Sequence, residues 1–233
     1  MNFHHILKTT HIHLSLAQHH KAHAFCAFAG CKVEDTSAAA AAQKLADEKL
    51  ANVTAAMKAR VCGSPAIDGY SHVVPKCLED SPTAKWWEAY YGAGGKQKDL
   101  VAHIETAADY DGLAVYWGIN NKKATVEECA EHCKNHLPNV VDGPFKKLPC
   151  NAFAFCPDDV CFEPDAHHHT KGDCWLKFTE GPAFPEVNMR GDLPQSYRSR
   201  HPTAPQRVQW QSGVLLPPGV KLTNGTWGPR WTW

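Results

Sequence analysis

The chain has 233 residues, and its 24 lysines and arginines equal its 24 aspartates and glutamates in number, so its formal net charge at pH 7 is zero. This balance excludes the uniform positive field that draws proteins to nucleic acid or anionic lipid, and we expect no nucleic-acid partner. No stretch approaches the about eighteen apolar residues of a membrane-spanning helix. We expect membrane association only through an anchor that this chain does not encode.

Ten cysteines distinguish the sequence, and their even number suits complete pairing in an oxidising compartment. Structural zinc is the alternative, but it usually shows matched C-x2-C knuckles, and no C-x2-C occurs here. The sequons at Asn52 and Asn224 predict glycosylation. We therefore expect a secreted or cell-surface glycoprotein.

Residues 1–34 form a leader that contains seven histidines. It lacks the uninterrupted apolar segment of a signal peptide, so for a secreted protein this start is atypical, truncated or wrongly assigned. We expect a disordered leader, and metal binding by its histidines is the alternative. Nothing in the sequence indicates whether Cys26 and Cys31 pair.

Residues 35–61 predict a helical arm, because they are rich in helix formers and open with capping residues. Leu50, Val53 and Met57 give this helix only a thin apolar stripe, which is typical of a partly exposed helix.

Residues 62–108 are a lead-in segment in which Cys62 and Cys77 would close a ring if they paired. The segment also holds an aromatic cluster, Trp86, Trp87, Tyr90 and Tyr91. Aromatic residues at i and i+4 favour packing of a short helix against the core, and a sugar-stacking surface is the alternative.

Residues 109–216 carry the clearest pattern of secondary structure. Large apolar residues alternate after Tyr110 as in a strand, and the pattern then changes to a helical period. Thr125 and Glu128 form a capping box that starts this helix just before Val126. Cys129 and Cys133 therefore lie on one helical face, from which each thiol can reach a different strand.

Further strands are predicted by the alternating residues of CNAFAFC, CWLKF and RVQWQSGVLL and by the short VCFE. Cys150 and Cys174 open two of these strands, whereas Cys156 and Cys161 bracket the turn PDDV and could close a hairpin. A Pro/Gly-rich connector precedes the last strand, and residues 217–233 form a tryptophan-rich C-terminal tail.

Taken together, T-x-x-E-C-x-x-x-C at Thr125 to Cys133, C-x-x-F at Cys150, C-W-L-K at Cys174 and W-x-S-G at Trp210 resemble the PAN/apple domain. The segment is similar to apple-domain proteins of green algae and land plants. The resemblance implies an α+β fold in which a small twisted antiparallel sheet is crossed by one helix, with an N-terminal helical arm and a Pro/Gly-rich C-terminal extension.

The resemblance also implies two disulfides that tie the helix to the sheet. The first joins Cys129 to Cys174, and the second joins Cys133 to Cys150. Cys156, Cys161 and the insertion FEPDAHHHTKGD depart from the common core of the family.

The insertion supplies most of the candidate ligand-binding residues. They are Asp165, His167, His168, His169, Trp175 and Trp210. The three histidines could bind a metal, but neighbouring residues point in divergent directions, so we expect a polar loop, no metal site and no cofactor. Five aromatic residues could belong to the core or its rim: Trp117, Phe155, Phe162, Trp175 and Trp210.

No catalytic motif is recognisable, and the carboxylates of the insertion suggest no cleft in which two of them would face each other. We therefore expect a non-catalytic module that binds a protein or a carbohydrate. Two alternatives stay open: an intracellular Cys/His metal-binding protein, and an accessory domain of a larger glycosyltransferase or protease.

Overall fold

The computed structural model of the protein describes residues 36–62, 73–224 and 227–228. The chain divides into two units, residues 1–47 and residues 48–233. Helix α2 (Thr36–Lys58) begins in the first unit. The side chains of its residues 37–47, which belong to this unit, are exposed. The predicted helix is thus confirmed, whereas the leader, Cys26 and Cys31 lie outside the described residues.

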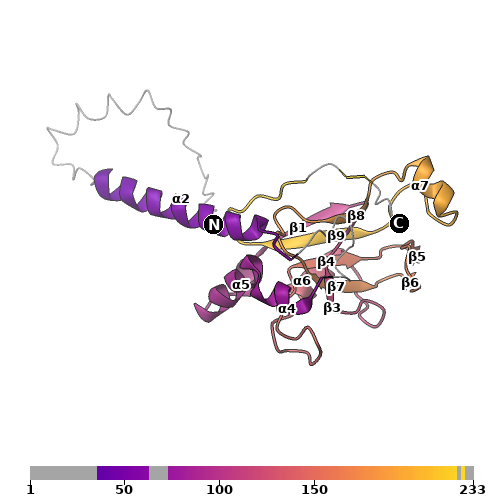
Figure 1. Cartoon of the computed structure of the whole chain (residues 1–233), viewed down its shortest axis with the longest axis horizontal. Coiled ribbons are helices and arrows are strands. Elements are labelled where there is room, and N and C mark those ends of the chain that lie inside the picture. The colour runs from indigo at the N-terminus through magenta and orange to yellow at the C-terminus, as the bar shows by residue number, and fades with distance from the viewer. Residues whose placement is uncertain (1–35, 63–72, 225–226, 229–233) are drawn as a thin grey trace, which may run out of the picture. The chain divides into compact units, whose positions relative to one another are not determined.

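The second unit is organised by a five-stranded antiparallel sheet with the strand order β1-β9-β4-β7-β3 (Figure 1). Its strands are β1 (Val101–Thr106), β3 (Leu113–Tyr116), β4 (Ala152–Phe155), β7 (Cys174–Phe178) and β9 (Gln211–Leu216). The last strand among the described residues, β9, lies between β1 and β4 and pairs with both. The central strand β4 is therefore paired on its two sides with β7 and β9, which come from distant parts of the sequence.

Smaller elements surround this sheet. Two short antiparallel pairs are formed by β2 (Ala108–Tyr110) with β8 (Val187–Arg190) and by β5 (Val160–Cys161) with β6 (His169–Thr170). The helices are α4 (Pro75–Asp80), α5 (Pro82–Gly92), the 3-10 turn η4 (Gln97–Asp99), α6 (Val126–Asn135) and α7 (Gln195–Arg200).

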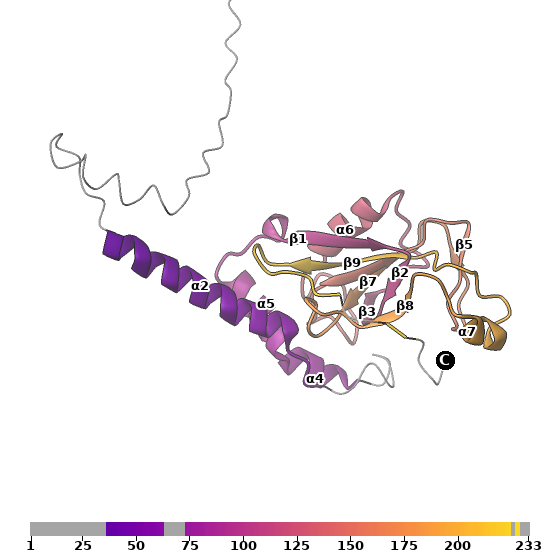
Figure 2. The same cartoon turned by 90° about the horizontal axis from the view of Figure 1, so that it is seen from above.

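Alternation along the strands divides the sheet into two faces. Phe153 and Phe155 of β4 point toward helix α6, where they join a buried cluster that includes Leu176 and Phe178. The intervening Ala152 and Ala154 belong to clusters on the other face. Figure 2 shows α6 on one side of the sheet and the β2–β8 pair on the other.

Helix α6 begins where the capping box predicts. The Thr125 hydroxyl accepts a hydrogen bond from the Glu128 amide over 3.2 Å, and the Glu128 carboxylate accepts one from the Ala124 amide over 2.9 Å. Because the cap fixes the start of the helix, Cys129 and Cys133 both face the sheet and are fully buried.

Four disulfides connect the described cysteines. Cys129 bonds to Cys174 and Cys133 to Cys150, so helix α6 is joined to β7 and to the approach to β4. The other two bonds are Cys62–Cys77 and Cys156–Cys161. The predicted α+β fold with a small antiparallel sheet and disulfides is therefore confirmed.

Two features differ from the sequence pattern. The Cys156–Cys161 bond closes the turn after β4, but β5 pairs with β6 rather than with β4, so the expected hairpin does not form. The neighbours of β4 are instead β7 and β9, whose longer ladders leave it no free edge. In addition, β1 from the lead-in segment forms an edge of the main sheet.

Candidate functional site

A cavity of about 160 Å³ lies on the sheet face opposite helix α6. Its polar wall consists of Asp109, Glu163, Asp165, His169 and Lys177. The rest of its wall consists of the indoles of Trp175 and Trp210 and the small residues Gly112, Ala114 and Ala154. We call this space the acidic cavity.

Small residues on neighbouring strands make room for the Lys177 side chain. In the sheet register Lys177 lies between Ala114 of β3 and Ala152 of β4, which offer only methyl groups to its flanks. Gly112 approaches so closely that a Cβ there would lie 2.9 Å from the Lys177 Cβ. The lysine chain can therefore lie along the sheet face with only 12% of its surface exposed.

The Lys177 ammonium is held by oxygen atoms from β2. It lies 3.4 Å from a carboxylate oxygen of Asp109 and donates to the Tyr110 carbonyl over 2.5 Å. The second oxygen of Asp109 accepts a hydrogen bond from the side-chain nitrogen of Asn188 over 2.6 Å. Burial by itself lowers the pKa of Lys177, but the surrounding carboxylates, led by Asp109, more than offset this effect, and the pKa is raised.

Hydrogen bonds from the segment before β9 position Glu163. The Gln209 side chain donates to the Val160 carbonyl over 2.7 Å and accepts from the Phe162 amide over 3.0 Å. The Trp210 indole nitrogen donates to the Phe162 carbonyl over 2.8 Å. The backbone that precedes Glu163 is thereby fixed on the cavity wall.

Glu163 is partly exposed as a residue, but its Oε2 is buried and has no hydrogen-bond partner in the part of the chain that the structure describes. Burial raises the pKa of Glu163 well above its ordinary range, the Asp109 carboxylate raises it further, and Lys177 only partly opposes the shift. Strongly shifted carboxyl groups in cavities are frequent at functional sites.

The three adjacent histidines have different surroundings. His169 is buried, and its Nε2 lies 3.2 Å from each carboxylate oxygen of Asp165. His167 is exposed beside Trp117, with 5.2 Å between ring centroids, and His168 is exposed. Within the described ranges no group of three or more His, Cys, Asp or Glu side chains could hold a metal ion.

An aromatic array continues from the acidic cavity to the surface. The His169 ring lies against Trp175 and Trp210, at centroid distances of 5.4 and 5.2 Å. Trp175 in turn lies 5.7 Å from Trp117, whose surface is 54% exposed. Gly118 permits this arrangement, because a Cβ there would lie within 2.6 Å of the Trp175 indole.

A second cavity, of about 340 Å³, lies next to the first. Trp117 lines this second cavity, and Ala114 lines both. The exposed indole thus lines a cavity that adjoins the acidic cavity at Ala114.

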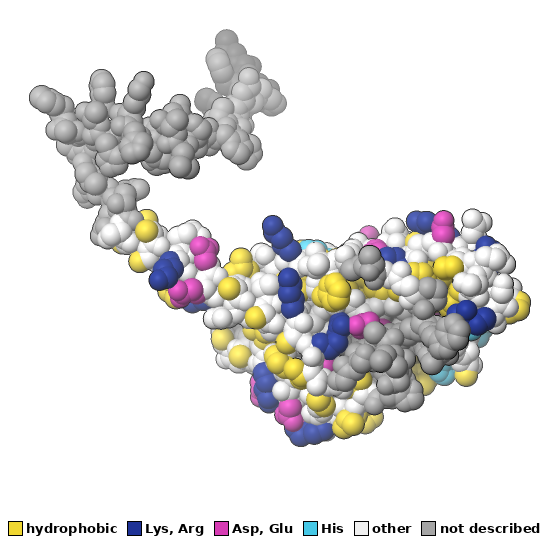
Figure 3. Space-filling model, turned by 45° about the horizontal axis from the view of Figure 1, so that its top comes forward, with side chains coloured by type: hydrophobic (Ala, Val, Ile, Leu, Met, Phe, Trp, Pro, Cys, Tyr) yellow, Lys and Arg dark blue, Asp and Glu magenta, His cyan; other side chains and the backbone are white. Residues whose placement is uncertain are grey.

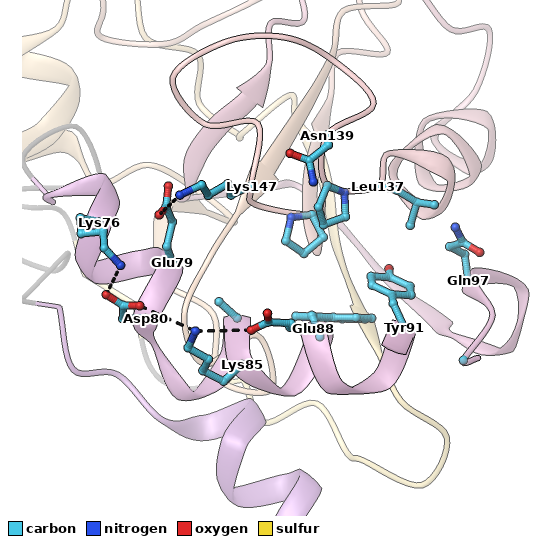
Figure 4. A pocket seen from close by; sticks show the side chains of 15 residues that line it. Lys76, Glu79, Asp80, Lys85, Glu88, Tyr91, Gln97, Leu137, Asn139 and Lys147 are labelled. Atoms are coloured by element: carbon cyan, nitrogen blue, oxygen red, sulfur yellow. Dashed lines mark hydrogen bonds and ion pairs between the residues drawn. The ribbon is translucent and has the colours of Figure 1, made fainter. Parts of the chain in front are cut away.

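A larger cavity of about 740 Å³ lies between helices α4 and α5 and residues 137–149 (Figure 4). Its charged side chains pair with one another. Lys85 lies 3.7 Å from Asp80 and 3.4 Å from Glu88, Lys147 lies 3.4 Å from Glu79, and Lys76 pairs with Asp80. It lacks the unpartnered buried carboxylate that distinguishes the acidic cavity.

Four residues predicted to bind ligand, Asp165, His169, Trp175 and Trp210, meet in the acidic cavity. His167 lies beside it near Trp117, and His168 is not among its lining residues. Asn52 and Asn224 of the sequons are both exposed.

Sequence reasoning did not single out Asp109 or Lys177, and it expected no cleft between carboxylates. That expectation was wrong in one respect, because Asp109, Glu163 and Asp165 line one cavity. Alternation in CWLKF places Lys177 on the same face as Trp175. From this pattern Lys177 could have been predicted as a residue of the site.

Of the five aromatic residues considered for core or rim, Phe155, Trp175 and Trp210 are buried. Phe162 is half-buried, and Trp117 is exposed. In the aromatic cluster of α5, Trp87 is fully buried, so this helix packs on the core through that residue.

Comparison of the chain with protein-family models, curated proteins and solved structures finds no match. No helix among the described residues has both the length and the apolar character needed to cross a membrane.

Proposed function

We propose that this protein is a non-catalytic carbohydrate-binding module of the secretory pathway or cell surface, with a PAN/apple-like scaffold. The observation that carries the proposal is the combination of the exposed Trp117 with the polar cavity beside Trp175. Indole rings stack on the apolar faces of sugars, and nearby carboxylates accept hydrogen bonds from hydroxyl groups.

The four disulfides support this proposal in a second way. They are expected in an oxidising compartment, and they leave the eight bonded cysteines without thiolates for a metal, which counts against the alternative of a Cys/His metal-binding protein. They also make the scaffold rigid, so loops such as residues 163–169 present their side chains in fixed positions.

On the face drawn in Figure 3, the described residues show no extended patch of a single charge that would favour a polyanion. Lysine, arginine, aspartate and glutamate side chains are interspersed with hydrophobic ones on the face drawn in Figure 3. We therefore expect recognition of sugar units by the cavities rather than by a long-range field.

A glycan array tests the proposal directly. The full chain, produced with its disulfides formed, should bind at least one class of glycan, and Trp117→Ala should reduce that signal. Phe184→Ala is the matched control, because Phe184 is also an exposed aromatic residue but lines none of the three cavities described above. Absence of binding by oxidised, folded protein to every glycan would overturn the proposal.

A further inference from the structure

The acidic cavity contains more carboxylates than cations. Asp109, Glu163 and Asp165 line it, whereas Lys177 is the one lysine or arginine among its lining residues. That lysine is already engaged by the Asp109 carboxylate and by the Tyr110 carbonyl. Asp165 lies beside His169, which leaves Glu163 as the lining carboxyl group without a hydrogen-bond partner among the described residues.

Glu163 is the group in this cavity that lacks a partner. Its Oε2 is buried and accepts no hydrogen bond from any residue that the structure describes, and Glu163 as a residue lines the cavity. A buried polar atom without a partner is unfavourable, and a donor supplied by a ligand would remove that penalty. An arriving ammonium group would also stabilise the ionised form of this carboxyl group.

The expected cation is organic rather than metallic. The described His, Cys, Asp and Glu side chains form no group suited to a metal ion. The cavity is instead walled by Trp175 and Trp210, and indole rings attract ammonium groups through their faces. A carboxylate next to aromatic walls is a combination that recognises protonated amines.

Resting on the proposed function, we infer that the sugar unit seated in the acidic cavity carries a free, protonated amino group that pairs with Glu163. The cavity of about 160 Å³ is smaller than the pockets of ~300–1,000 Å³ that enclose drug-sized ligands, so it takes one ring or its amino substituent. N-acetylation removes the positive charge and enlarges the group. The cavity therefore selects glucosamine-type units over N-acetylglucosamine-type units.

Titration calorimetry of the oxidised full chain near pH 6 tests this inference with two matched probes, a glucosamine oligomer and an N-acetylglucosamine oligomer of equal length. We expect the amino form to bind about tenfold more tightly, in keeping with a charge-assisted hydrogen bond. Glu163→Gln should remove this preference, chiefly by weakening the binding of the amino form.

Glu88→Gln is the control variant. Glu88 pairs with Lys85 beside the larger cavity in Figure 4, so this substitution makes the same carboxyl-to-amide change away from the acidic cavity. It should leave the affinities for both probes unchanged. An equal effect of the two substitutions would overturn the inference, because a change of overall charge would then explain the result.

The remaining outcomes separate the inference from the proposed function. Equal or tighter binding of the acetylated oligomer would overturn the inference and leave carbohydrate binding intact. Binding of a lysine-rich peptide, with no binding of either oligomer or of any glycan on the array, would overturn both and assign the cavity to a protein ligand.

Discussion

The ammonium of Lys177 and the carboxylate of Asp109 lie 3.4 Å apart in the interior of the molecule, with 12% and 3% of their side-chain surfaces exposed. This pair joins the main sheet to the β2–β8 pair and forms one wall of the acidic cavity. Breaking such a pair by removing one partner leaves an uncompensated buried charge.

Lys177→Met should therefore lower the free energy of unfolding by about 3 kcal/mol, as measured by urea denaturation. Lys76→Met provides the comparison, because Lys76 is 69% exposed in its pair with Asp80. Its loss should change the free energy of unfolding far less, because exposed ion pairs contribute little to stability. Similar losses in the two variants would contradict a structural role for the buried pair.

The disulfides should differ in their contributions to stability according to the loops that they close. Cys129 and Cys174 are 45 residues apart, whereas Cys156 and Cys161 are 5 apart. Replacing both cysteines of a pair with alanine should lower the free energy of unfolding by about 4 kcal/mol for the first pair and about 2 kcal/mol for the second. Chemical denaturation checks the order, and a larger loss for the short loop would contradict it.

Glu163 should make stability depend on pH. Because its pKa is raised in the folded state, its protonation stabilises the fold fully below the ordinary value of 4.5, and this contribution is lost as the pH rises through the folded-state pKa. The charged groups that set this pKa are Asp109, Asp165, Asp111 and Lys177.

Glu163→Gln removes this titration. The melting temperature of the variant, relative to that of the natural protein, should therefore rise as the pH is increased from about 4 to about 8. Scanning calorimetry at several pH values measures the difference. A difference that does not vary with pH would show that Glu163 titrates alike in the folded and unfolded chains.

Substitutions of Trp117 and of Trp210 should differ in effect, the first weakening glycan binding and the second lowering stability. Trp117 is 54% exposed, so Trp117→Ala should weaken glycan binding about tenfold and change the melting temperature little. Trp210 is 2% exposed, and Trp210→Ala should lower the free energy of unfolding by about 3–5 kcal/mol. Loss of stability in Trp117→Ala would mean that its indole serves the core.

Local patterns were sufficient to predict the elements of the main sheet that alternate clearly. Phe153 and Phe155 were placed on one face by their spacing, and the capping box at Thr125 gave the start of α6. These features depend on backbone geometry within a few residues, which the sequence encodes directly. The pairings of Cys129 and Cys133, in contrast, were expected only from the resemblance to a family.

The acidic cavity depends on contacts that no local pattern contains. Glu163 is positioned by hydrogen bonds from Gln209 and Trp210, which precede another strand. Asp109 meets Lys177 only because β2 packs against the face that β7 presents. Charged residues in short or irregular segments look like solvated surface until the tertiary fold is known.

The position of β9 between β1 and β4 has a consequence for the biogenesis of the protein. Trp210, which leads into this strand, completes the wall of the acidic cavity and anchors the segment before Glu163. A nascent chain cannot present the cavity until this late segment has been inserted between two strands made earlier. Retention on an immobilised ligand would therefore separate mature molecules from oxidised intermediates in which the final strand is still outside the sheet.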